Sequence, residues 1–398
     1  MKYITLFLFC FISIQGYGQS IKARQSSIIT VDSVAEILNL KVRLNDRIKV
    51  KGTGAEYLVQ ADTLVGYNTD TIAVVPTNGL FAKLQPQGKA FKTEWFNGYE
   101  EGHLIWNKAG EYAFETTKAG IDPLTGNFTD STTNRGNKVI ISQPITISER
   151  AFLYDNVTYA GLNTSISSDL TNNISPNVYI ENTTKIDTVF VALNRNKEQN
   201  IGTPSLYRSP KVENLTVFVK SEVGLLFSLW GLRGENFSNV FIQGNDLVDK
   251  AFLIDFAIFH TINTVRTERC DTAFHFANIG SSISTSIRYN NLSIARCQTG
   301  IVVDEEASES IKFNGLFVEL FDSVGIVVGN NNNLFIDNFD FENGTITTAS
   351  ALIRSEGINA RTLISVNDAR LKGQVTNIFD IQSAALLNIS NSDIEMLP

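Results

Sequence analysis

The stretch Asn290–Val303, NNLSIARCQTGIVV, repeats with small changes the earlier stretch Asn263–Phe276, NTVRTERCDTAFHF. Both contain an Arg-Cys pair, one polar residue and then Thr at the same offsets, followed by apolar residues, and the two copies start 27 positions apart by subtraction. A repeat of this length indicates a solenoid, a propeller or another repeat array. Such folds are built from several copies, and the rest of the chain contains them.

Copies of the repeat begin where Asn or a similar residue precedes an alternating apolar run. These starts are Asn214, Asn239, Thr264, Asn291, Gly315, Asn338, Asp368 and Asn391. By subtraction they lie 25, 25, 27, 24, 23, 30 and 23 positions apart, and a second apolar run, such as AFHF at Ala273, follows most of them. The runs are short, rich in β-branched residues and alternate with a period of two, as strands do. Two or three strands and a polar turn per repeat fit one coil of a parallel β-helix, whereas a propeller blade needs a longer repeat.

Equivalent residues of successive coils stack about 4.8 Å apart. We therefore expect Cys270 and Cys297 to be neighbours at one corner, either as buried small side chains or as a disulfide. The Asn side chains at the repeat starts are expected to hydrogen-bond to one another along the stack.

The segment Ile279–Asn343 resembles the right-handed parallel β-helices of the pectate-lyase-like superfamily, particularly those of phage tailspikes and their secreted bacterial relatives. VDSVAEILNLK, from Val31, is similar to their short helical lead-in, and GNKVIISQPITI, from Gly136, resembles the strand that starts their helix. A Gly-Asp-Gly/Asp-Asp-Thr element common in the superfamily is absent, and we expect a capping helix in Tyr112–Ala119 instead. The resemblance implies an all-β chain: a single-stranded right-handed parallel β-helix with a short N-terminal β-rich segment and a capping helix.

The chain begins with MKYITLFLFCFISIQGYGQS, which combines a positive charge, an apolar run and small residues. This pattern predicts a secretory signal peptide at residues 1–18, and hence a secreted or periplasmic protein with no membrane insertion after cleavage. An N-terminal β-rich segment is expected at 19–90, the capping helix and a loop at 91–138, and the β-helix at 139–398.

The charge and the cysteine count exclude several classes of function. The net charge is -8, which argues against nucleic acid as a partner. Two cysteines outside the signal peptide are too few for a disulfide scaffold, and with the three histidines they are too dispersed for zinc. The acidic turn of Asp304, Glu305, Glu306 and Glu309 offers oxygens for calcium, but a solvated turn explains it better, so no metal or other cofactor is expected.

Stacking also aligns the side chains that point outward after each repeat start. The expected outward pairs are Phe241/Gln243, Arg266/Glu268, Ser293/Ala295, Phe317/Glu319 and Asp340/Glu342. Glu319 and Glu342 would be one coil apart, with Asp340 diagonal to them and Glu268 two coils away. Such a separation is typical of the carboxylate pair of a glycosidase. Phe241 and Phe317 would be exposed platforms for sugar rings, with Gln243 as a polar contact to the substrate.

Three functions fit this column, all of them involving an extracellular polysaccharide or a surface. The favoured one is a glycoside hydrolase that uses Glu319 with Glu342 or Asp340. A polysaccharide lyase would use Arg266 to neutralise a uronate carboxylate and His260 as the base. A non-catalytic adhesin or structural β-helix would need neither, because an acidic protein carries solvated carboxylates on any face.

Two further features have alternative interpretations. His275, in the middle of AFHF, is expected to be a packing residue in a column with Leu226, Leu253, Val302 and Val327. The apolar segment Val223–Leu232 is either core or the interface of a homotrimer, an assembly that the tailspike resemblance implies.

Overall fold

The structure is a computed structural model. It describes residues 28–61, 73–85, 90–96, 101–115, 137–154, 156–162, 176–193, 210–279, 283–343, 351–356, 362–373, 375–381 and 385–396. The chain divides into two compact units, Met1–Gln87 and Gly88–Pro398, whereas the sequence places this boundary at residue 90. The predicted signal peptide, residues 1–18, lies outside the described residues.

The first unit contains a five-stranded sheet in the order β1-β2-β3-β5-β4. Its elements are β1 (Ile28–Val31), the 3-10 helix η1 (Val34–Asn39), β2 (Arg47–Val50), β3 (Glu56–Gln60), β4 (Ala73–Val74) and β5 (Phe81–Gln85). Burial alternates along β3 and β5, so that Tyr57, Val59 and Leu84 form the core. The predicted β-rich segment and short helical lead-in are confirmed.

The second unit opens with β6 (Ala90–Lys92), the 3-10 helix η2 (Thr93–Phe96) and helix α2 (Gly102–Glu115). The predicted capping helix is present, but its predicted bounds are wrong, since α2 starts ten residues earlier. Its buried residues Ile105, Ala109 and Tyr112 have the i, i+4, i+7 spacing of an amphipathic helix. Trp106 stacks on Tyr159 of the first coils at 4.6 Å between ring centroids, so α2 covers that end of the β-helix.

The β-helix itself is built from β7 to β26. Their bounds are β7 (Lys138–Ile141), β8 (Ile145–Ile147), β9 (Ala151–Tyr154), β10 (Thr158–Gly161), β11 (Val178–Ile180), β12 (Ile186–Leu193), β13 (Lys211–Val219), β14 (Val223–Gln243), β15 (Val248–Glu268), β16 (Thr272–Ala277), β17 (Ile287–Ala295), β18 (Thr299–Val303), β19 (Ile311–Glu319), β20 (Val324–Gly329), β21 (Asn333–Asn343), β22 (Ala351–Glu356), β23 (Leu363–Gly373), β24 (Asn377–Ile381), β25 (Leu386–Ser390) and β26 (Asp393–Met396). All of their pairings are parallel.

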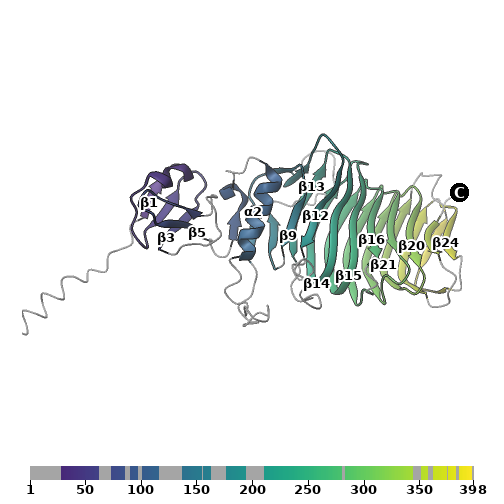
Figure 1. The fold of residues 1–398 in the computed structure, drawn as a ribbon. Coiled ribbons are helices and arrows are strands. Elements are labelled where there is room, and N and C mark those ends of the chain that lie inside the picture. The colour runs from purple at the N-terminus through teal and green to yellow at the C-terminus, as the bar shows by residue number, and fades with distance from the viewer. Residues whose placement is uncertain are drawn as a thin grey trace, which may run out of the picture. The chain divides into compact units, whose positions relative to one another are not determined.

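Strand pairing joins each coil to the next. β15, β17, β19, β21 and β23 form one parallel ladder, and β16, β18, β20, β22 and β24 form another, which Figure 1 shows as stacked layers. The first ladder continues through β14 into β13, and its register partners in chain order are Leu215, Val240, Val265, Leu292, Leu316, Phe339 and Ala369. Their spacing reproduces the spacing of the predicted repeat starts, which confirms the parallel β-helix.

The repeat starts are corners of the backbone. All eight have φ between +48° and +76°, the left-handed region that Gly and Asn tolerate best. The burial alternation slips there: in β19, Phe313 and Leu316 are buried, while Asn314 and Gly315 between them are not. Each of these strands therefore has a leading segment before the left-handed residue and a trailing segment after it.

Thr264 is the β-branched residue in this left-handed column, with φ of +52° and an exposed side chain. Branching at Cβ makes that conformation strained. We expect Thr264→Asn to raise the free energy of unfolding by about 1 kcal/mol in urea denaturation, because Asn relieves the strain. The matched control is Thr261→Asn, at an ordinary strand position. An equal gain at both positions would contradict the backbone explanation.

Aromatic rings and apolar side chains fill the interior. The rings of Phe190, Phe227, Phe252 and Phe274 stack along the axis, with centroids 4.7, 5.0 and 4.7 Å apart. Phe227 belongs to the apolar segment Val223–Leu232, whose Leu226 and Leu229 are also buried. These side chains are therefore core.

Cys270 and Cys297 are free and buried. A hydrogen bond with Cys297, together with burial, holds the pKa of Cys270 well above its ordinary value, so the thiols are neighbours as predicted. Of the two arrangements that the sequence allows, the structure has packed thiols.

The predicted Asn ladder is correct for one pair and shifted for others. Asn239 Nδ2 donates to Asn214 Oδ1 at 2.7 Å. Asn338 donates instead to Asn314 Oδ1, at 3.0 Å, because the repeat start below it is a glycine without a side chain. The amide ladder therefore uses the residue before the corner wherever the corner residue offers no amide.

Among the described residues, no helix is long and apolar enough to cross a membrane.

Candidate functional site

The outward side chains of the trailing segments form two columns, in the predicted order. One column contains Phe241, Arg266, Ser293, Phe317, Asp340 and Arg370, and the other contains Gln243, Glu268, Ala295, Glu319, Glu342 and Lys372. We call these two columns the trailing face. The outward pairs predicted from the sequence belong to these columns. The prediction did not include the last coil, which contributes Arg370 and Lys372.

Glu319 and Glu342 are register partners on neighbouring coils, so their backbones are about 4.8 Å apart. Glu342 is exposed and Glu319 is half-buried. Neither carboxylate makes an ion pair with a described residue, whereas Asp340 lies 3.3 Å from Arg370 Nε through its Oδ1. Of the four predicted catalytic carboxylates, which include Glu268, Glu319 and Glu342 are thus the pair that a ligand can reach without breaking an ion pair with a described residue.

Glu268 is not an exposed member of the column, as the alternation predicted, because it is 3% exposed. Arg266 Nη2 lies 3.6 Å from its Oε2, and Arg296 Nη1 of the next corner lies 3.6 Å from its Oε1. Two long cationic side chains therefore cover this carboxylate. It balances their charge and is closed to a ligand.

Phe241 is not an exposed sugar platform, since it is 3% exposed. Its register partner Arg266 covers it, with the guanidinium carbon 6.0 Å from the ring centroid. Phe317 is half-buried, and its register partners on the two neighbouring coils are Ser293 and Asp340. Gln243, the third predicted substrate-binding residue, is also half-buried. Phe317 is thus the aromatic side chain available beside the glutamate pair.

His260 is fully buried, which corrects its predicted place as an accessible base. Its ring meets the ring of Tyr289 edge-on at 5.7 Å, and Tyr289 Oη lies 3.4 Å from its Nδ1. Burial lowers the pKa of His260 to about 3, so the imidazole is neutral at any ordinary pH. A substrate on the outer surface does not reach it.

The side chain of His275 is only 15% exposed between its register partners, which agrees with its predicted packing role, and it also contacts a carboxylate. Its Nε2 lies 2.9 Å from Asp304 Oδ1. In its column the register partners are Leu253 and Val302, as predicted, but the coil before contributes Ser228 and not Leu226. The second apolar run of that coil is offset by two residues from the pattern read in the sequence.

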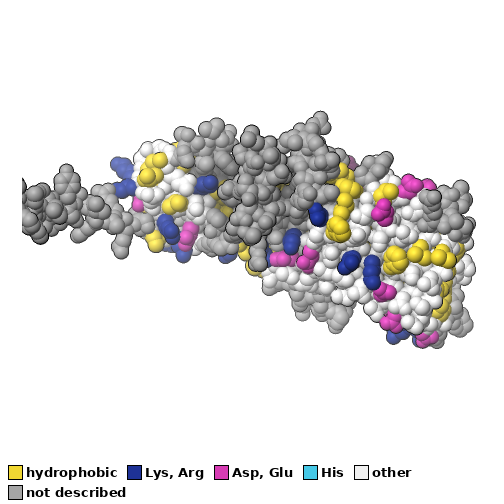
Figure 2. Space-filling view, turned by 90° about the horizontal axis from the view of Figure 1, so that it is seen from below, with side chains coloured by type: hydrophobic (Ala, Val, Ile, Leu, Met, Phe, Trp, Pro, Cys, Tyr) yellow, Lys and Arg dark blue, Asp and Glu magenta, His cyan; other side chains and the backbone are white. Residues whose placement is uncertain are grey.

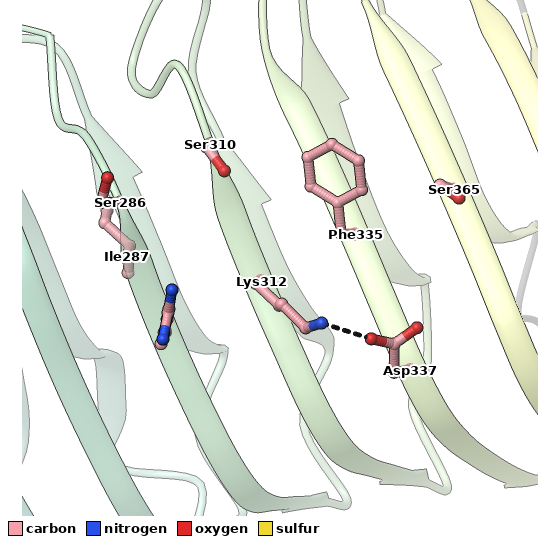
Figure 3. Close-up of a pocket in the computed structure, with 8 residues that line it drawn as sticks. Ser286, Ile287, Ser310, Lys312, Phe335, Asp337 and Ser365 are labelled. Atoms are coloured by element: carbon pink, nitrogen blue, oxygen red, sulfur yellow. Dashed lines mark ion pairs between the residues drawn. The ribbon is translucent and has the colours of Figure 1, made fainter.

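A groove on the leading segments was missed in the sequence. It has a volume of about 410 Å³ and crosses four coils, and Figure 3 shows its lining side chains. Its lining residues are Ser286, Ile287, Arg288, Ser310, Lys312, Phe335, Asp337 and Ser365. Arg288, Lys312, Phe335 and Ser365 are register partners, so the groove follows a column. The sequence contains a pattern that could have predicted this column. In IRYN, from Ile287, and IKFN, from Ile311, a basic residue stands at the same outward position before the repeat start.

Charged side chains of both signs are interspersed on the side of the β-helix seen in Figure 2.

The carboxylates of the acidic turn after β18 contact other side chains of the protein. Asp304 contacts His275, and the side chains of Glu305 and Glu306 accept hydrogen bonds from Asn330 and Asn331. Among the described residues, no group of three or more His, Cys, Asp or Glu side chains could hold a metal ion.

No protein-family model and no curated protein matches this sequence. Among solved structures, the chain is similar to the gp42 tailspike of Acinetobacter phage vb_AbaP_AS12 and to the tailspike protein of Acinetobacter phage vB_ApiP_P1, each with a TM-score of 0.55. The identities are 12% and 11%. The matches cover 87% of this chain and 57% of the first tailspike, and 92% of this chain and 71% of the second. The chain therefore spans little more than half of the first tailspike, and the likeness confirms the fold.

Proposed function

We propose that this chain, which has the parallel β-helix fold of those tailspikes, is a glycoside hydrolase that acts on an extracellular polysaccharide through Glu319 and Glu342. The observation that carries the proposal is the register of these two carboxylates on neighbouring coils of an outward face. The carboxyl groups of retaining glycosidases are about 5–5.5 Å apart, which one coil spacing of about 4.8 Å supports. Phe317, two residues before Glu319 on the same side of β19, offers a ring face to a sugar.

In this mechanism one glutamate attacks the anomeric carbon as the glycosidic bond breaks, and the other gives its proton to the departing oxygen. A water then gives up a proton to that second glutamate and releases the sugar from the first. Two inversions at the same carbon retain its configuration. Asp340 is restrained by Arg370, so we assign it the positioning of a substrate hydroxyl.

The lyase alternative loses its base, because His260 is fully buried. Its proposed cation, Arg266, is 20% exposed in its side chain and is engaged with Glu268. No observation on the described residues favours this reaction over hydrolysis.

The test is incubation of the protein with a panel of neutral and uronate-containing polysaccharides, following new reducing ends and the ultraviolet absorbance of unsaturated uronates. New reducing ends without the absorbance are expected. Reducing ends accompanied by the absorbance would replace hydrolysis by elimination. Retention of a polymer without any cleavage would instead identify an adhesin.

A further inference from the structure

We propose that the groove on the leading segments is a binding site for a negatively charged sugar residue, with Arg288 as its principal contact. This inference rests on the proposed function in one respect, namely that the ligand is a polysaccharide. It adds the substrate class, which the glutamate pair alone does not define. The groove volume of about 410 Å³ lies within the range of small-molecule sites.

The charges in the groove favour an anion. Arg288 and Lys312 are register partners on neighbouring coils, and Arg288 is exposed without an ion pair to a described residue. Lys312 Nζ lies 2.6 Å from Asp337 Oδ2, the contact drawn in Figure 3, so that carboxylate balances the lysine. One positive charge is left over in the groove. In a protein with a net charge of -8, an uncompensated arginine on a hollowed surface points to a specific anionic ligand.

The uncharged lining residues suit a sugar ring. Phe335 is half-buried in register with Lys312 and presents part of its ring in the groove. Ser310 and Ser365 add hydroxyl groups that both donate and accept hydrogen bonds, as sugar hydroxyls require. A guanidinium binds a carboxylate with two parallel hydrogen bonds, and it also binds sulfate or phosphate substituents. The shared chemistry is therefore an acidic group on a sugar.

The groove and the glutamate pair belong to the same coils. Lys312 is on the leading segment and Glu319 on the trailing segment of β19, and Asp337 and Glu342 are related in the same way in β21. A polymer that crosses the corner contacts both. The groove then holds an acidic residue at a fixed number of sugars from the bond that is cleaved.

Binding to immobilised polysaccharides tests this proposal, and a Glu319→Gln background keeps cleavage from affecting it. The panel contains uronate polymers, their carboxyl-reduced forms, sulfated polymers and neutral polymers. We expect at least one acidic polymer to bind about tenfold more tightly than its uncharged counterpart, and Arg288→Ala to remove that preference. Asp337→Asn frees Lys312 and should strengthen binding.

Arg150→Ala is the matched control, because Arg150 is also exposed but lies in the early coils before β9. It should leave binding unchanged. Equal binding of acidic and uncharged polymers, no binding to any acidic polymer, or full binding by Arg288→Ala would overturn the proposal. Since cleavage is measured separately with the unmodified glutamates, failure of the hydrolase proposal and failure of the groove proposal give different results.

Discussion

Replacement of Glu319 by Gln is expected to reduce the rate of polysaccharide cleavage by about 10²–10⁴-fold, which is the usual contribution of a proton-transferring or nucleophilic carboxylate. Glu342→Gln should have an effect of the same size. Glutamine keeps the volume and the hydrogen bonding of the side chain but neither attacks a sugar nor delivers a proton. The rate is measured as new reducing ends per unit time on the polymer identified by the panel.

The double variant provides a sharper result than either single one. If the two glutamates act as one unit, Glu319→Gln combined with Glu342→Gln should be little slower than each alone. Asp340→Asn should cost less, because Asp340 is held by Arg370. Glu306→Gln, an exposed carboxylate of the acidic turn, is the control for a general loss of negative charge. Cleavage by Glu319→Gln within threefold of the wild type, in a folded protein, would rule out the assigned pair.

The coil architecture could be predicted because stacking imposes one pattern on every repeat. A residue such as Asn239 or Asn291 has to adopt the left-handed conformation at the corner, and the strand after it has to alternate. Both requirements leave a direct trace in the amino-acid sequence. The intervals between repeat starts therefore predict the strand register, including the long interval of 30 that ends at Asp368.

Exposure of individual side chains could not be predicted in the same way. Alternation places Glu268 and Phe241 on the outer side, and their register there is correct. Their burial is due to Arg266 and Arg296, long side chains that lie along the surface and cover neighbouring positions. Such coverage depends on rotamers and not on periodicity. Register alone therefore does not identify the site. When the carboxylates that form ion pairs with described residues are excluded as well, Glu319 and Glu342 remain as the candidate pair.

Acidification is expected to destabilise the protein through His260, with a slope that a single substitution removes. The pKa of His260 is about 3 in the folded protein because the side chain is fully buried. In the unfolded chain it returns to about 6.5. Between these two values the unfolded state binds a proton that the folded state does not bind, so the free energy of unfolding falls as the pH falls. The contribution is fully present above pH 6.5 and is lost toward pH 3.

His260→Phe should lack this dependence, because phenylalanine does not titrate and retains an aromatic ring against Tyr289. Urea unfolding of both proteins at several pH values between 7 and 3.5 measures the difference, in which all other titrating groups cancel. We expect the wild type to lose stability relative to the variant by about 1.4 kcal/mol per pH unit, up to on the order of 4 kcal/mol. His260→Gln is a second uncharged replacement. The free energy of unfolding of this variant should depend on pH as that of His260→Phe does, even if its absolute stability is lower. Parallel curves for the wild type and both variants would mean that His260 is protonated in the folded state and hence reachable by water, which would restore it as a candidate base and reopen the elimination reaction.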